Sequence, residues 1–163
     1  MSATASFYVV PDERLSDIVA AATPVRGGWF RPARDMFWDV LRGAGRQLEA
    51  FGWSGWVFTH LEIYVESRHG FLYSKFGDDA ASRQLSAARH SDWLVLPAAS
   101  AAELLTMLEG VACEAGDVTA FIVGEYGAAD AAEGAVAVQA ALVTLKTWLA
   151  AVSPGSVGLL SIG

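Results

Sequence analysis

The segment FGWSGWVFTHLEIYVES, residues 51–67, holds the residues of this chain whose types are best suited to chemistry. His60 and Glu62 are a candidate acid and base, and Trp53 and Trp56 are candidate walls of a pocket. Imidazole titrates close to neutral pH, which suits it to proton transfer. We therefore take His60 and Glu62 as candidate catalytic residues, while the sequence leaves open whether the protein is an enzyme.

Familiar motifs for metal, serine and nucleotide chemistry are incomplete in this chain. His60 and Glu62 match the H-x-E of zinc nucleoside deaminases, but that site also needs paired cysteines, and Cys113 is the single cysteine. GWSGW has tryptophan at the second glycine of a nucleophile elbow, and GAGRQL lacks the last glycine of a dinucleotide-binding loop. We predict no metal site and no cofactor.

Tryptophan and arginine are dense in the first third of the chain. Together they are typical of binding interfaces and cation–π stacking, but a core rimmed by arginine stems has the same composition. The candidate ligand-binding residues are Arg26, Trp29, Arg31, Trp53 and Trp56. Between these alternatives, we predict that Trp53, Trp56 and His60 face the core.

The net charge of the 163-residue chain is -7, and the acidic excess lies in its second part. Between His90 and Lys146 there are eight acidic residues and no lysine or arginine. Such a surface repels the phosphates of nucleic acids and complements a basic protein. We expect a basic protein partner and no nucleic acid, and the oligomeric state stays open.

Three features of the sequence bear on the cellular compartment. A single cysteine gives the fold no dependence on oxidising conditions, and the first residues have neither the basic region nor the long apolar run of a signal peptide. Residues 134–152 are apolar but alanine-rich and include Gln139 and Lys146, which predicts a buried helix instead of a membrane span. We expect a cytoplasmic protein with no membrane contact.

Strands are predicted at residues 4–10, 92–97 and 157–162, where apolar and β-branched residues end at proline or at the C-terminus. Residues 157–162 are apolar on both faces, so this strand is expected to lie inside a sheet, beside the N-terminal strand. Helical spacing of apolar residues predicts helices that begin near Asp12, Asp35, Asp78, Ser100, Asp117 and Asp130. The last of these runs to Val152.

Local signals refine several of these boundaries. Capping boxes are expected at Ser100 with Glu103 and at Asp130 with Glu133, and residues 46–51 are expected to add a helical turn. Residues 56–76 fit either a helix or a hairpin. We favour the helix, with Ser54 as its N-cap, Trp53 packed on Phe58, and Gly70 as its stop.

The order of these elements resembles the YfbM-like bacterial domain of unknown function. The resemblance rests on ASFYVVPDERLSDIV, FWDVL, DWLVLPAASAAELL and the final helix that runs into VGLLSIG, while residues 53–77 depart from the pattern. It implies a small bacterial cytoplasmic protein with an α+β fold. It transfers no site residues to this chain.

We therefore predict an α+β fold in a single domain over residues 1–163. A small sheet that includes the N- and C-terminal strands packs against several helices, one of them long and C-terminal. The leading functional hypothesis is a non-enzymatic protein-binding module, with immunity-type neutralisation of a toxin as one form. The alternative is a small-ligand-binding protein or a hydrolase-like enzyme with an aromatic and arginine pocket.

Overall fold

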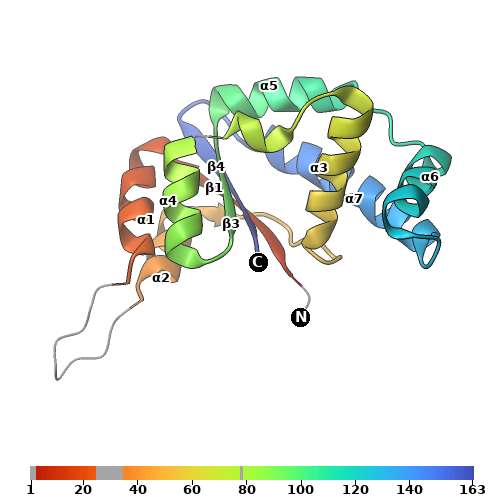
Figure 1. Cartoon of the computed structure of the whole chain (residues 1–163). Coiled ribbons are helices and arrows are strands. Elements are labelled where there is room, and N and C mark those ends of the chain that lie inside the picture. Colours follow the sequence, from red (N-terminus) through yellow and green to blue (C-terminus); the bar gives the residue numbers. More distant parts are fainter. Residues whose placement is uncertain (1–2, 25–34, 78) are drawn as a thin grey trace.

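The structure is a computed structural model that describes residues 3–24, 35–77 and 79–163. Within these residues, four strands form an antiparallel sheet in the order β2-β1-β4-β3. The strands are β1 (Ala5–Pro11), β2 (Arg46–Gln47), β3 (Asp92–Pro97) and β4 (Ser156–Ile162). Figure 1 shows the sheet standing between two groups of helices.

The two terminal strands pair along their whole length, from Ala5 opposite Ile162 to Pro11 opposite Ser156. β4 pairs with β3 on its other side, which makes β4 an interior strand. This pairing confirms the prediction drawn from its two apolar faces. β3 also has the predicted bounds.

One face of the sheet is covered by α1 (Leu15–Ala22), α2 (Phe37–Ala44) and α4 (Asp79–Arg89). A short 3-10 helix, η1 (Asp12–Arg14), leads from β1 into α1. Ile18, Phe37, Leu41 and Leu85 of these elements are fully buried, and they pack in one cluster with Trp93 and other sheet residues. We call this group of helices the small layer.

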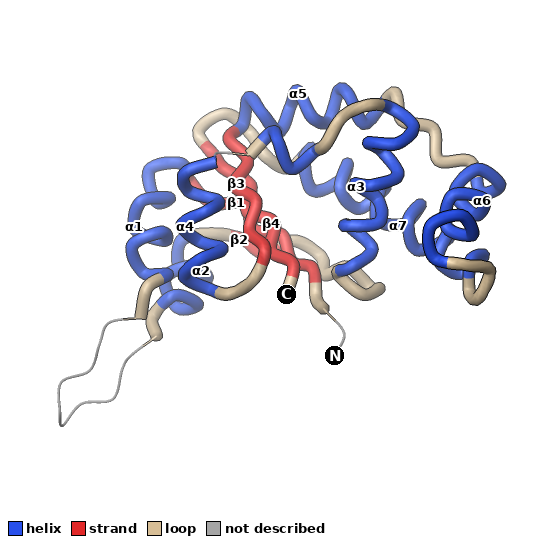
Figure 2. Tube along the Cα trace, viewed as in Figure 1, coloured by secondary structure: helices blue, strands red, loops and turns tan. Residues whose placement is uncertain are grey.

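The opposite face carries α3 (Trp56–His69), α5 (Ala98–Glu109), α6 (Ala115–Tyr126) and α7 (Ala131–Ala150), with a second 3-10 helix, η2 (Tyr73–Phe76). Figure 2 shows these helices on the side of the sheet away from α1 and α4. The predicted long C-terminal helix is α7, whose 20 residues contact α3, α5 and α6. We call this group the large layer.

Trp148 of α7 joins the large layer to the sheet. Its indole is stacked between the rings of Phe7 and Phe58, with centroid distances of 5.4 and 5.3 Å. The end of the Phe7 ring lies over Gly158 of β4, the residue paired with Val9, and a Cβ at Gly158 would lie only 2.5 Å from it. The Trp148 indole N–H donates to the carbonyl of Glu49 at 3.2 Å. Sheet, α3 and α7 therefore share one buried row of aromatic rings.

The open edge of β3 is closed by two serine hydroxyls of α4. Ser86 Oγ accepts the backbone N–H of Trp93, and Ser82 Oγ accepts that of Val95, each at 2.9 Å. A four-residue step on a helix rises about 6 Å, close to the two-residue step of a strand, so the two pairs match in spacing. Unpaired N–H groups on an edge strand invite association with other chains, and here they are satisfied.

Residues 56–69 form helix α3, which confirms the helix over the hairpin, and Gly70 ends it with φ at 76°. The predicted start is wrong, because the N-cap is Gly55 and the ring packed on Phe58 is that of Phe51, at 4.8 Å. The Gly55 N–H donates to the Ala3 carbonyl at 2.8 Å, and a Cβ there would lie 2.7 Å from the Thr4 backbone. Close approach to the N-terminal segment fixes where α3 begins.

Three other local predictions are wrong. α5 begins at Ala98, ahead of Ser100, while α7 begins after Asp130 as expected, but neither helix has a side-chain hydrogen bond at its N-cap. Residues 46–51 add no helical turn. Arg46 and Gln47 instead pair with β1, since the edge of that strand gains main-chain partners that outweigh a weak local helix preference.

No single helix in the described ranges has both the length and the apolarity to cross a membrane. α6 and α7 meet that test only as a pair, bent by 117° at the break between them.

Candidate functional site

The faces of α3 separate the two candidate catalytic residues. Residues two apart on a helix point about 200° away from each other. Accordingly, His60 lines a pocket formed with α6 and α7, whereas Glu62 lines a cleft formed with η2, α4 and β3. The structure does not bring His60 and Glu62 together as an acid and base.

Glu62 has a structural role in its cleft, which has a volume of about 300 Å³. Glu62 Oε1 accepts the backbone N–H of Ser74 at 2.7 Å, and the hydroxyl of Tyr73 donates to the carbonyl of Phe58. Burial raises the pKa of Tyr73 well above its ordinary value, and the Glu62 charge adds to this effect. These contacts hold η2 against α3 and occupy one of the two carboxylate oxygens of Glu62.

Trp53 and Trp56 lie outside the core, which corrects the prediction for both. Trp53 is 37% exposed and lines a groove of about 510 Å³ between residues 48–53 and α7, and Trp56 is 51% exposed at the start of α3. The fully or almost fully buried side chains of α3 are Phe58, Leu61, Tyr64 and Val65. α3 is apolar on several faces, so its sequence does not indicate which face is buried.

The pocket beside His60 has a volume of about 230 Å³ and lies between α3, α6 and α7. The rings of His60 and Tyr126 meet edge to face, with centroids 4.5 Å apart at 81°. The remaining lining residues are Val57, Ile122, Gly134 and Val138. Apart from the imidazole and the phenol, the side chains around this pocket are therefore apolar.

Both polar groups of this pocket are uncharged at neutral pH. Burial lowers the pKa of His60, which leaves the imidazole neutral, and burial together with the nearby Glu125 charge raises the pKa of Tyr126. His60 Nδ1 is buried and has no hydrogen-bond partner among the described residues. The pocket is an uncharged cavity next to an acidic part of the chain.

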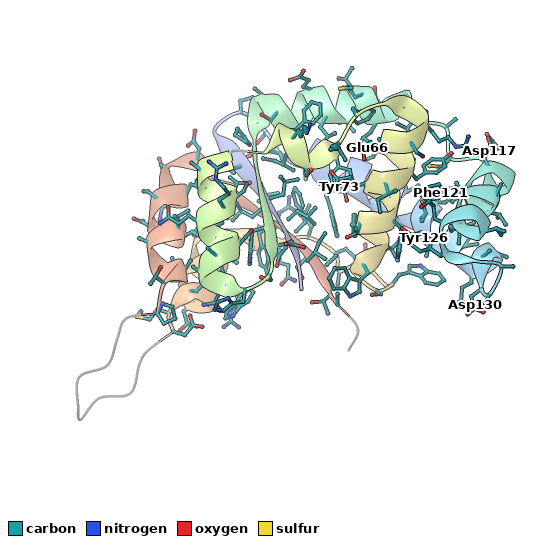
Figure 3. All side chains as sticks on the ribbon, viewed as in Figure 1. Glu66, Tyr73, Asp117, Phe121, Tyr126 and Asp130 are labelled. Carbon is teal, nitrogen blue, oxygen red and sulfur yellow. The ribbon has the colours of Figure 1, made fainter. Side chains whose placement is uncertain are left out.

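Acidic side chains flank the pocket where α7 begins. Asp130 and Glu133 are exposed in the segment that leads to Gly134, and neither forms an ion pair with any described residue. Figure 3 shows Tyr126 between α3 and α6, with Asp130 beyond it at the start of α7. Arg68 is the nearby base on α3, and it lines a different hollow, together with Glu125.

Tyr126, Ile122 and Gly134 were not singled out in the sequence. Tyr126 precedes Gly127, the residue that ends α6, and this position gives no sign that its ring meets His60, 66 positions earlier. Arg26, Trp29 and Arg31 lie in residues 25–34, outside the described residues. The structure therefore leaves the arginine part of the proposed aromatic and arginine pocket as a prediction.

Other chemical groups give no competing site in the described part of the chain. There, no group of three or more His, Cys, Asp or Glu side chains could hold a metal ion. Cys113 is half-buried, and burial raises the pKa of its thiol, the opposite of the change that activates a cysteine nucleophile.

The sequence matches no family model and no curated protein. Among solved structures, the fold is similar to the crystal structure of YfbM, a protein of unknown function from Escherichia coli. The TM-score is 0.54 at 13% identity, and the match covers 98% of this chain and 99% of that chain. The resemblance to YfbM predicted from the order of elements is thus confirmed as a likeness of fold.

Proposed function

We propose that this protein is a protein-binding module whose partner docks a basic segment on the surface formed by α3 and α6. This surface consists of Trp56, His60, Val123 and Tyr126, and we call it the α3–α6 surface. Trp56 and His60 are one turn apart on α3, Val123 and Tyr126 are one turn apart on α6, and the His60 and Tyr126 rings touch. The four side chains therefore belong to one continuous area.

The observation that carries this proposal is the exposure of large apolar side chains on that area. Trp56 is 51% exposed, Tyr126 50% and Val123 43%. Tryptophan and tyrosine are the residues that most often dominate binding energy at interfaces, and grouped exposed apolar side chains indicate interaction sites. None of the residues that the structure describes covers these rings fully.

The negative charge near this surface indicates a positively charged partner. Residues 91–145 contain no lysine or arginine, and Asp130 and Glu133 shortly precede Gly134, which lines the pocket together with His60 and Tyr126. A basic partner would be attracted to this region, and complementary charge favours fast and selective association. We propose a bacterial cytoplasmic protein, with neutralisation of a basic toxin as the most specific form of the function.

The proposal is tested with an identified partner. The purified chain is immobilised at low salt, proteins retained from a lysate of the host are identified by mass spectrometry, and the candidate is purified. Calorimetry then gives its Kd at 50 and 300 mM salt. We expect a partner with a basic binding region, a Kd that rises with salt, and a loss of about 100-fold in the double variant Trp56→Ser, Tyr126→Ser.

Val143→Ser is the matched control, because Val143 is 65% exposed and lies on α7 at the groove beside Trp53. This variant should change the Kd less than twofold. Equal retention of all proteins by the wild type and the double variant would contradict the proposal. A Kd weakened by Val143→Ser and unchanged in the double variant would place the interface at the α7 groove instead.

A further inference from the structure

In the small layer, a cation of the chain itself lies over aromatic rings. The Arg89 guanidinium lies over the Phe37 ring at 4.6 Å and the Trp38 ring at 5.6 Å, and it forms an ion pair with Asp35 at 2.9 Å. Aromatic ring, cation and carboxylate thus lie in one cluster. The charges of Arg89 and Asp35 are paired with each other, and Arg89 Nε has no hydrogen-bond partner among the described residues.

On the large layer, an aromatic ring and carboxylates also occur near each other, but no described residue forms an ion pair with these carboxylates. Tyr126 is half-exposed, Asp130 and Glu133 are exposed at the adjoining start of α7, and no lysine or arginine occurs in residues 91–145. We infer that the pocket between α3, α6 and α7 receives one long aliphatic cation, the side chain of a lysine or arginine of the partner. This inference rests on the protein-binding function proposed above.

The shape and chemistry of the pocket suit the stem of such a side chain. Its volume of about 230 Å³ exceeds the roughly 150 Å³ cavity that holds a benzene molecule in an engineered protein core. Val57, Ile122 and Val138 offer the methylenes an apolar lining. Lysine and arginine bury their stems on apolar surface and keep the charged group near water, so the head would stay at the mouth.

The mouth suits the charged head. A cation within about 6 Å of an aromatic ring is attracted to the ring face, and the Tyr126 ring is half-exposed. Asp130 and Glu133 supply negative charge that no described residue neutralises through an ion pair. An acidic side chain would be repelled by these carboxylates.

Gly134 of α7 lines the pocket. A Cβ at Gly134 would lie 3.0 Å from Ile122 Cδ1, so α6 and α7 meet closely there and any larger side chain would occupy the cavity. Gly124 on α6 is the contrasting glycine, since a Cβ there would meet no atom within 4 Å. Gly134→Leu and Gly124→Ala are therefore a filling variant and its control.

The test is an NMR titration of the full chain with blocked single amino acids. The probes are N-acetyl-lysine N-methylamide and N-acetyl-arginine N-methylamide, with the norleucine and glutamate analogues as neutral and acidic controls. We expect the cationic probes to shift the methyl resonances of Val57, Ile122 and Val138 at millimolar concentration. Norleucine should bind about fivefold more weakly, because it lacks the charged head, and glutamate should cause no shift.

Three variants make the result decisive. Gly134→Leu should abolish the methyl shifts while Gly124→Ala keeps them, and Asp130→Asn with Glu133→Gln should reduce the preference for lysine over norleucine to less than twofold. If Gly134→Leu does not fold, Tyr126→Leu, at a half-exposed position, tests the same mouth. Equal binding of norleucine and lysine, or shifts that persist in both pocket variants, would overturn the inference.

The failure of this inference is distinct from that of the protein-binding function. If the identified partner binds Gly134→Leu and Tyr126→Leu as tightly as the wild type, the cation pocket is wrong although the protein still binds a partner. If lysine fills the pocket and no protein distinguishes the wild type from Trp56→Ser, Tyr126→Ser, the binding module is wrong and the pocket stands as a site for small amines.

Discussion

The two layers of the molecule differ in whether their aromatic and charged side chains find partners within the chain. In the small layer, Arg89 covers Phe37 and Trp38 and pairs with Asp35, and the serines of α4 close the edge of β3. In the large layer, Trp56 and Tyr126 are about half-exposed beside acids that no described residue pairs. The Arg89 charge of the small layer is paired within the chain, whereas the exposed rings and acids of the large layer are the proposed contact for a partner.

The largest expected effect on stability comes from a substitution in the core of the large layer. Trp148→Ala removes the middle ring of the row formed with Phe7 and Phe58, and it should lower the free energy of unfolding by about 3–5 kcal/mol. Urea unfolding followed by circular dichroism measures this loss. A loss below about 1 kcal/mol would show that this row is not the link between the layer and the sheet.

The closed edge of the small layer gives the next effect. Ser86→Ala leaves the Trp93 N–H without its acceptor and should cost about 1–3 kcal/mol, with a similar cost for Ser82→Ala at Val95. The double variant should also associate at high concentration, detected by light scattering, because the edge of β3 becomes available. Thr106→Ala, which removes an exposed hydroxyl contact within α5, is the control and should leave both measurements nearly unchanged.

The exposed ring of the large layer should matter little for stability. Trp56→Ser is expected to change the free energy of unfolding by less than about 0.5 kcal/mol, as for other surface substitutions. Trp38→Ser should cost more, because Trp38 packs against Phe37, Trp93 and Arg89. Equal losses from the two substitutions in urea unfolding would remove the contrast between a completed and an uncovered surface.

The smallest effect concerns pH and His60. Burial in the folded chain lowers the pKa of His60, so the unfolded chain takes up its proton at higher pH than the folded one. The stabilisation from neutral His60 is fully present above the unfolded value of about 6.5 and is lost as the pH falls through the lower folded pKa. As the pH is lowered below about 6.5, the free energy of unfolding should therefore fall less steeply for His60→Gln than for the wild type. Parallel pH curves for the two proteins would show that His60 is not titrating in this way.

Much of the fold could be predicted because its signals are local. The strands at residues 92–97 and 157–162 are indicated by apolar and β-branched residues that end at proline or at the C-terminus. The apolar stripe of α7 likewise indicates the long helix. β2 could not be predicted, because its two residues are strand only through pairing with β1, about 40 positions away. The start of α3 likewise depends on contact between Gly55 and the N-terminal segment.

The site was less predictable than the fold, for the same physical reason. His60 was identified by its chemical type, but its contact with Tyr126 and the presence of Gly134 in the pocket lining depend on how α6 and α7 pack against α3. Glu62 is only two positions from His60 but lines another cleft, because side chains two positions apart on a helix point to nearly opposite sides. Spacing in the sequence therefore placed both side chains on one helix without indicating that they lie on different faces of it.

The central claim is that the large layer carries the partner site, and two exposed tryptophans test it most directly. Trp56 and Trp38 are 51% and 40% exposed on opposite layers. With the identified partner, calorimetry should show a Kd about 30-fold weaker for Trp56→Ser, as for an interface hot spot, and a change below twofold for Trp38→Ser. An unchanged Kd for Trp56→Ser, or an equal loss for Trp38→Ser, would contradict the claim.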